Sequence, residues 1–213
     1  DGNPLFLFEN LRALEESGRV ARDARGAWTV TGTLHDLPAP PSIQHLIQAR
    51  FAGLEEEDKS LLEIACCAGF EFDPVLVAEA AGLAVLPALK RFALIEKRHR
   101  LIHAEERSYV FDHHQVQEAL YAGLMEPLRE RYHVALAETL ESREHARDQD
   151  PKDVDGAVAV ALCEHYFRGG RGRDGLRFLH RSLHHLGTLR PAATVQLIDH
   201  ALAIPGLVTG SER

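Results

Sequence analysis

The chain has 213 residues but only three cysteines, and nowhere do about 18 apolar residues follow one another. Cys66 and Cys67 are adjacent and Cys163 stands alone, so we expect buried, reduced thiols rather than a disulfide framework. No basic segment followed by an apolar stretch and a small-residue cleavage site opens the sequence. From these absences we expect a cytoplasmic protein without membrane contacts.

The motifs of ATP hydrolysis and of zinc binding are also missing. A glycine-rich phosphate loop ending in lysine and serine or threonine occurs nowhere in the sequence. His180 and His184 share one helical face, but no glutamate follows His180 as a zinc-protease motif requires. Cys163 and His165 are two positions apart, and such neighbours point to different sides of a helix. The sequence therefore predicts no metal site, no catalytic residue and no cofactor bound by this chain alone.

Positive charge is scarce relative to negative charge. The chain carries 32 acidic and 24 basic side chains, and residues 41–124 are the most acidic part, with 13 acidic against 8 basic. Affinity for nucleic acid comes largely from basic side chains that neutralise phosphates. The charge balance therefore disfavours DNA as a partner.

The spacing of apolar residues predicts a mainly α-helical protein in three parts. In residues 1–40, Asn3 and Pro4 are suited to begin a helix, and two short strand-like runs around Trp28 predict a β-hairpin. The proline-rich segment Leu37–Pro41 interrupts regular structure and marks the first domain boundary. The opening on a helix cap leads us to expect a piece of a longer chain.

Residues 41–124 are predicted to form a winged helix-turn-helix. Helix-like patterns are followed by a two-stranded wing that contains Tyr109–Phe111, and a further helix begins after it. The order helix, helix, turn, helix and wing is that of a winged helix-turn-helix. The expected helices cover about residues 42–53, 55–68, 74–81 and 86–94, and the helix after the wing has its apolar positions from Val116 to Leu124.

Residues 125–213 are predicted to be wholly helical. The expected helices cover about residues 127–141, 154–167, 174–186 and 191–204. Helices of this length joined by short turns are typical of antiparallel hairpins in tetratricopeptide-like repeats. The segment Arg168–Arg173, RGGRGR, is interpreted as a glycine-rich turn between two of them, with an anion or RNA site as the alternative.

Four stretches in this order resemble the region that follows the ATPase core in bacterial STAND-type regulatory ATPases. They are GNPLFLFENLRAL, LPAPPSIQHLIQARFAGLEEEDKSLLEIACCAGFEFD, YVFDHHQVQEALYAGL and LCEHYFRGGRGRDGLRFL. These signalling proteins are fused to cyclase, kinase or LuxR-like output domains. The resemblance implies that residues 1–40 are the tail of a nucleotide-binding module, that a parent protein binds ATP or ADP, and that the chain acts in signal transduction or transcription regulation.

The resemblance also implies two groups of nucleotide contacts. The family's glycine-any-proline motif lies near the adenine, and its counterpart here is Gly2, Asn3 and Pro4. The family's wing-to-helix signature matches Phe111, His113 and Glu118–Tyr121, and its histidine reaches a nucleotide phosphate. These residues would act only together with the ATPase core in the same polypeptide, and the alternative is that Pro4 starts a helix and that His113 caps or packs.

Three functions therefore remain open. The first is a non-catalytic regulatory module of a STAND-type ATPase, which couples the nucleotide state to partner sensing. The second is a DNA-binding regulator that uses cations around the predicted recognition helix. These cations are Lys90, Arg91, Lys97, Arg98 and Arg100. The third is a scaffold that binds protein partners through its helical repeats. The output domain, the sensed signal and the oligomeric state are not encoded in any motif of the sequence.

Overall fold

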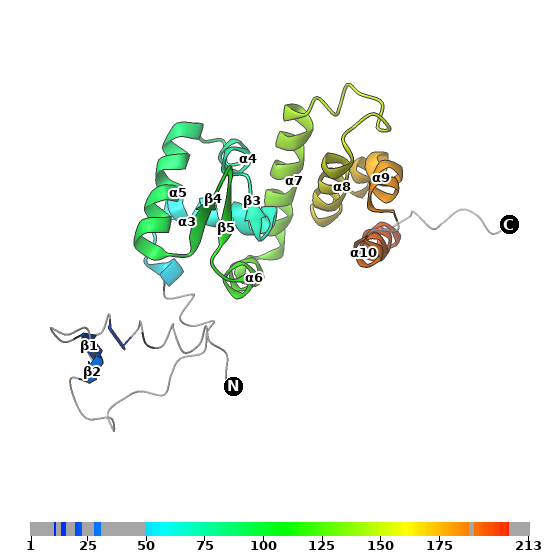
Figure 1. Cartoon of the computed structure of the whole chain (residues 1–213). Helices are drawn as coiled ribbons and strands as arrows, with labels where there is room; N and C mark the ends of the chain where they lie inside the picture. Colours follow the sequence, from blue (N-terminus) through cyan, green and yellow to red (C-terminus); the bar gives the residue numbers. More distant parts are fainter. Residues whose placement is uncertain are drawn as a thin grey trace. The chain divides into compact units, whose positions relative to one another are not determined.

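The computed structural model describes residues 11, 14–15, 20–22, 28–30, 50–187 and 190–204, and it divides the chain into two compact units, Asp1–Glu55 and Glu56–Arg213. In the first unit, β1 (Val20–Arg22) pairs antiparallel with β2 (Trp28–Val30), which confirms the predicted hairpin (Figure 1). Residues 11, 14 and 15 are helical, whereas the rest of the helix predicted after Pro4, the proline-rich joint and most of the helix expected at residues 42–53 lie outside the described residues.

The second unit contains eight helices and three strands among its described residues. In chain order they are α3 (Glu56–Ala68), β3 (Glu71–Phe72), α4 (Pro74–Ala80), α5 (Val85–His99), β4 (Ile102–Glu105), β5 (Ser108–Phe111), α6 (His114–Gly123), α7 (Glu126–Arg143), α8 (Gly156–Arg168), α9 (Gly172–Leu186) and α10 (Pro191–Leu202). The protein is mainly helical with small antiparallel sheets, as predicted. The three-part division at residues 40 and 124 stays a prediction.

The three strands form one antiparallel sheet in the order β3-β5-β4. Phe72 pairs with Tyr109, and Ile102 pairs with Phe111 at the other edge of β5. The rings of Phe72 and Phe92 lie 5.5 Å apart, so α5 is joined to the sheet by aromatic packing. Phe92, Ile102 and Phe111 are almost completely buried. This aromatic cluster is the centre of the core of residues 56–124.

Two details of this region differ from the sequence prediction. Helix α5 continues to His99 instead of stopping at Leu94, because Ile95 is buried and extends the apolar face. The helix ends at Arg100, which has a left-handed backbone with φ 49°. Strand β3 was not expected, because two residues are too few for an alternating pattern to be recognised.

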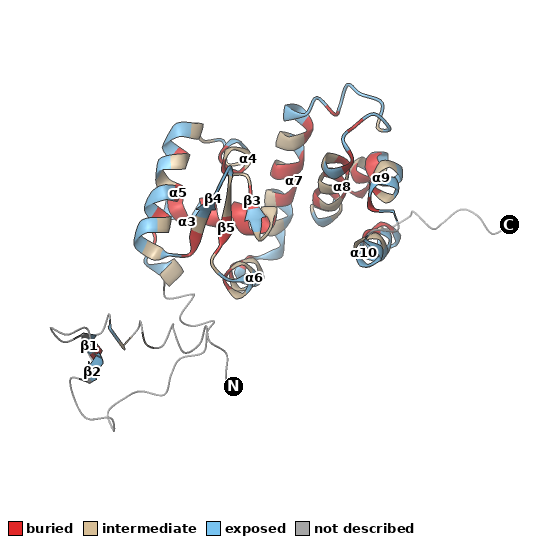
Figure 2. Ribbon diagram, in the orientation of Figure 1, coloured by how far each residue is buried: buried red, intermediate tan, exposed pale blue. Residues whose placement is uncertain are grey.

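Helix α7 lies between α3 and α4 on one side and α8 on the other (Figure 1). It is buried on more than one side, and its fully or nearly buried residues include two polar side chains, His133 and Glu141 (Figure 2). The sequence prediction placed apolar residues such as Leu128, Leu136 and Leu140 on the packed face, but it gave no role to these two. Helix α7 therefore packs against elements on both sides of the predicted boundary at residue 124.

Helices α8 and α9 pack against each other along their length, and α10 packs on both. Gly170, in the turn between α8 and α9, has φ 71°, and the N–H of Arg171 donates to the carbonyl of Tyr166 at 2.9 Å. This left-handed glycine is a common way to end a helix, so the predicted glycine-rich turn is confirmed. Across the described ranges, no helix has the length and apolar character needed to span a bilayer.

Candidate functional site

His113, the predicted phosphate-contacting residue, occupies the cap position at the start of α6. Its backbone is extended, its carbonyl accepts from the N–H of Val116 at 2.9 Å, and its exposed side chain makes no capping hydrogen bond. The imidazole therefore faces solvent beside the first N–H groups of α6, where an anion is favoured. Gly2, Asn3 and Pro4 lie outside the described residues.

The other residues of the wing-to-helix signature serve mainly the fold. Phe111 and Leu120 are buried, and Tyr121 bonds with His133 on α7. The ring that packs at this helix start belongs to His114, which stacks on Phe70 with ring centres 3.6 Å apart. His113 is thus the N-cap residue of α6, as the capping alternative expected, but it caps through its backbone carbonyl and not through its side chain.

The predicted cationic surface on α5 is divided between exposed and paired side chains. Lys90, Lys97, Arg98 and Arg100 are exposed. Arg91 instead forms ion pairs within the fold, at 2.8 Å to Asp58 and also to Glu57. Asp58 is 8% exposed, so Arg91 neutralises a nearly buried carboxylate and stabilises α5 against α3.

Apolar and acidic side chains accompany these cations. Leu86 and Leu94 are 65% and 45% exposed on α5. Glu105 and Glu106 are exposed in the turn of the β4–β5 hairpin. Glutamates beside these cations disfavour DNA as a partner, because DNA interfaces are strongly positive.

A buried hydrogen-bonded chain connects α6, α7 and α8. The Tyr121 hydroxyl lies 3.0 Å from Nε2 of His133, and Nδ1 of His133 lies 2.9 Å from Nδ1 of His165. His133 is completely buried and His165 is 9% exposed. A neutral imidazole donates at one nitrogen and accepts at the other, so the three groups donate in one direction along the chain.

The imidazoles of His133 and His165 are both held in the neutral form. Burial, followed by the neighbouring His165 and the positive charges of Arg168 and Arg129, lowers the pKa of His133 to about 3. Burial and then Arg168 lower the pKa of His165 to about 4. Neither imidazole is poised to exchange a proton near neutral pH, so the hydrogen bonds from Tyr121 through His133 to His165 serve packing rather than acid–base chemistry.

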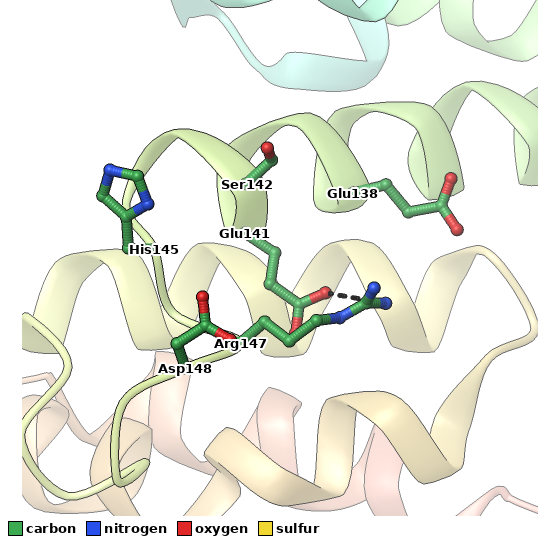
Figure 3. A pocket seen from close by; sticks show the side chains of 6 residues that line it. All are labelled: Glu138, Glu141, Ser142, His145, Arg147 and Asp148. Atoms are coloured by element: carbon green, nitrogen blue, oxygen red, sulfur yellow. Dashed lines mark ion pairs between the residues drawn. The ribbon is translucent and has the colours of Figure 1, made fainter.

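A polar cavity of about 330 Å³ lies at the end of α7 and contains residue types that catalysis uses (Figure 3). Its most buried carboxylate, Glu141, accepts from the Tyr166 hydroxyl at 2.7 Å and from Arg177 at 3.2 Å. In Figure 3 the Arg147 guanidinium lies beside Glu141, while His145 points away from it. The carboxylate is already engaged by three partners, so the cavity is best explained as a structural polar cluster.

The histidines and cysteines considered as metal or nucleophile candidates are not brought together. His180 and His184 are exposed, and the described ranges contain no group of three or more side chains arranged to hold a metal ion. Burial raises the pKa of the Cys163 thiol to about 12, which disfavours the reactive thiolate. Cys66, Cys67 and Cys163 are buried free thiols, as predicted.

His133 and Glu141 were missed by sequence reasoning because a polar residue on a helix is ordinarily read as solvent-facing. The available signal was spacing: His133 lies three and four residues before Leu136 and Ala137, and Glu141 lies four residues after Ala137, so both are on packed sides of α7. Comparisons with sequence families, with curated proteins and with solved structures found no match to this chain.

Proposed function

We propose that this chain is a non-catalytic regulatory module of a multidomain STAND-type signalling ATPase, in which it couples the nucleotide state of a core in the same polypeptide to the sensing of a protein partner. The observation that carries the proposal is the position of His113. Its exposed imidazole stands at the start of a helix directly after a β-strand, without a capping bond. An imidazole beside free N–H groups is suited to a nucleotide phosphate.

The order of elements supports the finer fold assignment. Three helices, α3, α4 and α5, precede the hairpin β4–β5, which is the order of a winged helix with β4–β5 as its wing. Helices α8 and α9 then resemble a hairpin of tetratricopeptide-like type. In this proposal the winged helix docks over the nucleotide, and the repeats contact protein partners.

The proposal is tested in the parent protein with its ATPase core by measuring ADP affinity. We expect His113→Ala to weaken ADP binding about 10-fold or more, because a hydrogen bond to a charged phosphate contributes about 1.5–3 kcal/mol. Pro4→Ala should weaken it less, because it removes only an apolar contact with the base. His180→Ala, at an exposed histidine on α9, is the matched control and should leave the affinity unchanged.

Unchanged ADP affinity in His113→Ala would disprove the nucleotide-sensing role. A coding sequence that shows no phosphate loop in the domain before Asp1 would disprove the wider assignment. That domain is expected within about 200 to 300 residues, the length of one large domain.

DNA binding is the second candidate, and the exposed side chains of Lys90, Lys97, Arg98 and Arg100 favour it. Paired Arg91 and the acidic hairpin turn disfavour it. A mobility-shift assay at several salt concentrations decides the matter with a variant in which Lys90, Lys97 and Arg98 become glutamate. Binding that weakens with salt and disappears in the variant would establish the DNA-binding function. If neither function holds, the repeats remain as a protein-interaction scaffold.

A further inference from the structure

A second cavity, of about 450 Å³, lies where α6, α7, α8, the start of α9 and α10 come together. Its volume falls in the range of about 300–1,000 Å³ that is usual for small-molecule sites. Three basic side chains, Arg129, Arg168 and His200, line it together with Tyr121. None of the residues that line it is an aspartate or a glutamate.

The arginines of this region have different roles. Arg171 is occupied by the fold, because it pairs with Asp174 at 2.7 Å and also with Glu138. Arg129 instead lies over the Tyr121 ring, with 5.1 Å between its guanidinium carbon and the ring centre. Arg168 is the last residue of α8 and is exposed at the cavity. The cavity is therefore lined by cationic groups whose charges its own walls do not neutralise.

Apolar side chains line the cavity as well. They include Phe167 and Ile204. A Cβ atom on Gly172 would come within 2.6 Å of Cδ1 of Ile204, so glycine at this position allows Ile204 to approach the start of α9. Glu130 approaches the rim, with Oε1 3.8 Å from where a Cβ atom on Gly170 would lie. The cavity thus combines cationic and apolar lining residues.

We propose that this cavity binds a small organic anion, whose charged group contacts Arg129 and Arg168 and whose apolar body packs on Phe167 and Ile204. Guanidinium groups bind carboxylate and phosphate oxygens through paired hydrogen bonds. Two guanidinium groups match a phosphate monoester, with a charge of about −1.5 to −2 at pH 7, better than a carboxylate. The ligand class is therefore a phosphate monoester of an apolar alcohol.

A bound anion would also act on the buried histidines. Arg168 and Arg129 are among the groups that lower the pKa of His133. An anion between these arginines would offset their positive charge and connect α7 and α8 with the end of α10. This site is independent of the proposed relation to signalling ATPases, because it needs only residues of this chain.

The experiment is calorimetric titration of the full chain at low ionic strength with phenyl phosphate, phenylacetate, inorganic phosphate and benzyl alcohol. We expect phenyl phosphate to bind most tightly, phenylacetate more weakly, inorganic phosphate at least about 10-fold more weakly than phenyl phosphate, and benzyl alcohol undetectably. Arg168→Gln and Arg129→Gln should each weaken phenyl phosphate binding about 10-fold or more, as expected for a hydrogen bond to a charged group. Arg168→Lys keeps the charge without the forked donors, so its affinity for phenyl phosphate should be intermediate between that of the glutamine variants and that of the wild type.

The matched control is Arg173→Gln, because Arg173 is exposed at the start of α9 and does not line the cavity. It should bind phenyl phosphate like the wild type, and NMR resonances of His133 and His165 should shift on binding in both proteins. Equal weakening in Arg173→Gln and Arg168→Gln would reduce the effect to general charge attraction and overturn the proposal. Binding of inorganic phosphate or benzyl alcohol as tightly as phenyl phosphate would overturn it as well, as would the absence of any binding.

Discussion

Residues 56–124 and residues 126–204 are both mainly helical, but their interiors differ in kind. The first region is centred on aromatic rings, with Phe92 and Phe111 completely buried against the small sheet. The second also has an apolar core, in which Leu162, Tyr166 and Phe178 are almost completely buried, but it adds the buried polar side chains of His133, Glu141 and Ser182. An apolar core tolerates loss of shape poorly, whereas buried polar groups depend on every partner being present. The two regions should therefore respond differently to substitution and to pH.

The largest effect is expected from a cavity in the aromatic interior. Phe92→Ala should lower the free energy of unfolding by about 3–5 kcal/mol, because it removes a completely buried ring. Urea denaturation measures this, and Leu94→Ala, at a residue 45% exposed on the same helix, should cost well under half as much. Similar losses in the two variants would contradict the importance of the aromatic cluster.

A smaller loss in the free energy of unfolding is expected when a hydrogen-bond partner is removed from the buried polar groups of residues 126–204. Glu141→Ala leaves the Tyr166 hydroxyl without its 2.7 Å acceptor and should cost about 2–3 kcal/mol. Tyr166→Phe should cost about 1–2 kcal/mol, and the double variant less than the sum of the two. A double-mutant cycle by urea denaturation measures the difference, and additive losses would show that the bond contributes nothing.

The pH dependence of stability should differ in sign between the two regions. His133 has a lowered pKa of about 3, so the unfolded chain binds its proton first and stability falls as pH drops below about 6.5. At pH 5 the loss relative to pH 7 is about 2 kcal/mol for this imidazole. His133→Gln should remove that part of the slope, whereas His180→Gln should not. Equal slopes in all three proteins would contradict the neutral state of His133.

In the first region the corresponding effect has the opposite sign. The hydrogen bond with Asp112 raises the pKa of His103, so its stabilisation is present at low pH and is lost as pH rises through the folded pKa. The His103 side chain is partly exposed, at 44%, and His103→Gln should therefore change the slope only slightly, in the direction opposite to His133→Gln.

A small loss of stability is also expected at Gly172, where the segment after α10 approaches the start of α9. Gly172→Ala places a Cβ atom 2.6 Å from Ile204, and the resulting strain should cost about 1 kcal/mol after the gain in helix propensity is included. Gly123→Ala is the control, because a Cβ atom there meets nothing within 4 Å. Thermal denaturation should show a Tm below that of the wild type for Gly172→Ala and an unchanged Tm for Gly123→Ala. A Tm for Gly172→Ala equal to that of the wild type would exclude close packing of Ile204.

The first interior is more predictable from sequence than the second. Asp73 accepts from the N–H of Val75 at 2.8 Å and caps α4, as the Asp-Pro pair indicates, and the strand at Tyr109 is where its aromatic and β-branched residues place it. Helix α7 was predicted to within two residues at each end, but its burial on more than one side was not, because polar His133 and Glu141 lie among its packed positions. The cationic cavity was also beyond prediction, since Arg129, Arg168 and His200 are brought together only by the packing of three helices.

Helix α7 has a mechanical consequence. It is held to α3 by the bond from Tyr132 to Glu63 and to α4 by the pair of Arg143 with Asp73, and its buried histidine joins it to α8. A displacement of α8 should therefore displace α3 as well, because the contacts with both helices are made by the single helix α7. Displacement of the C-terminal helices would tilt α7 and so change the packing contacts of both regions together.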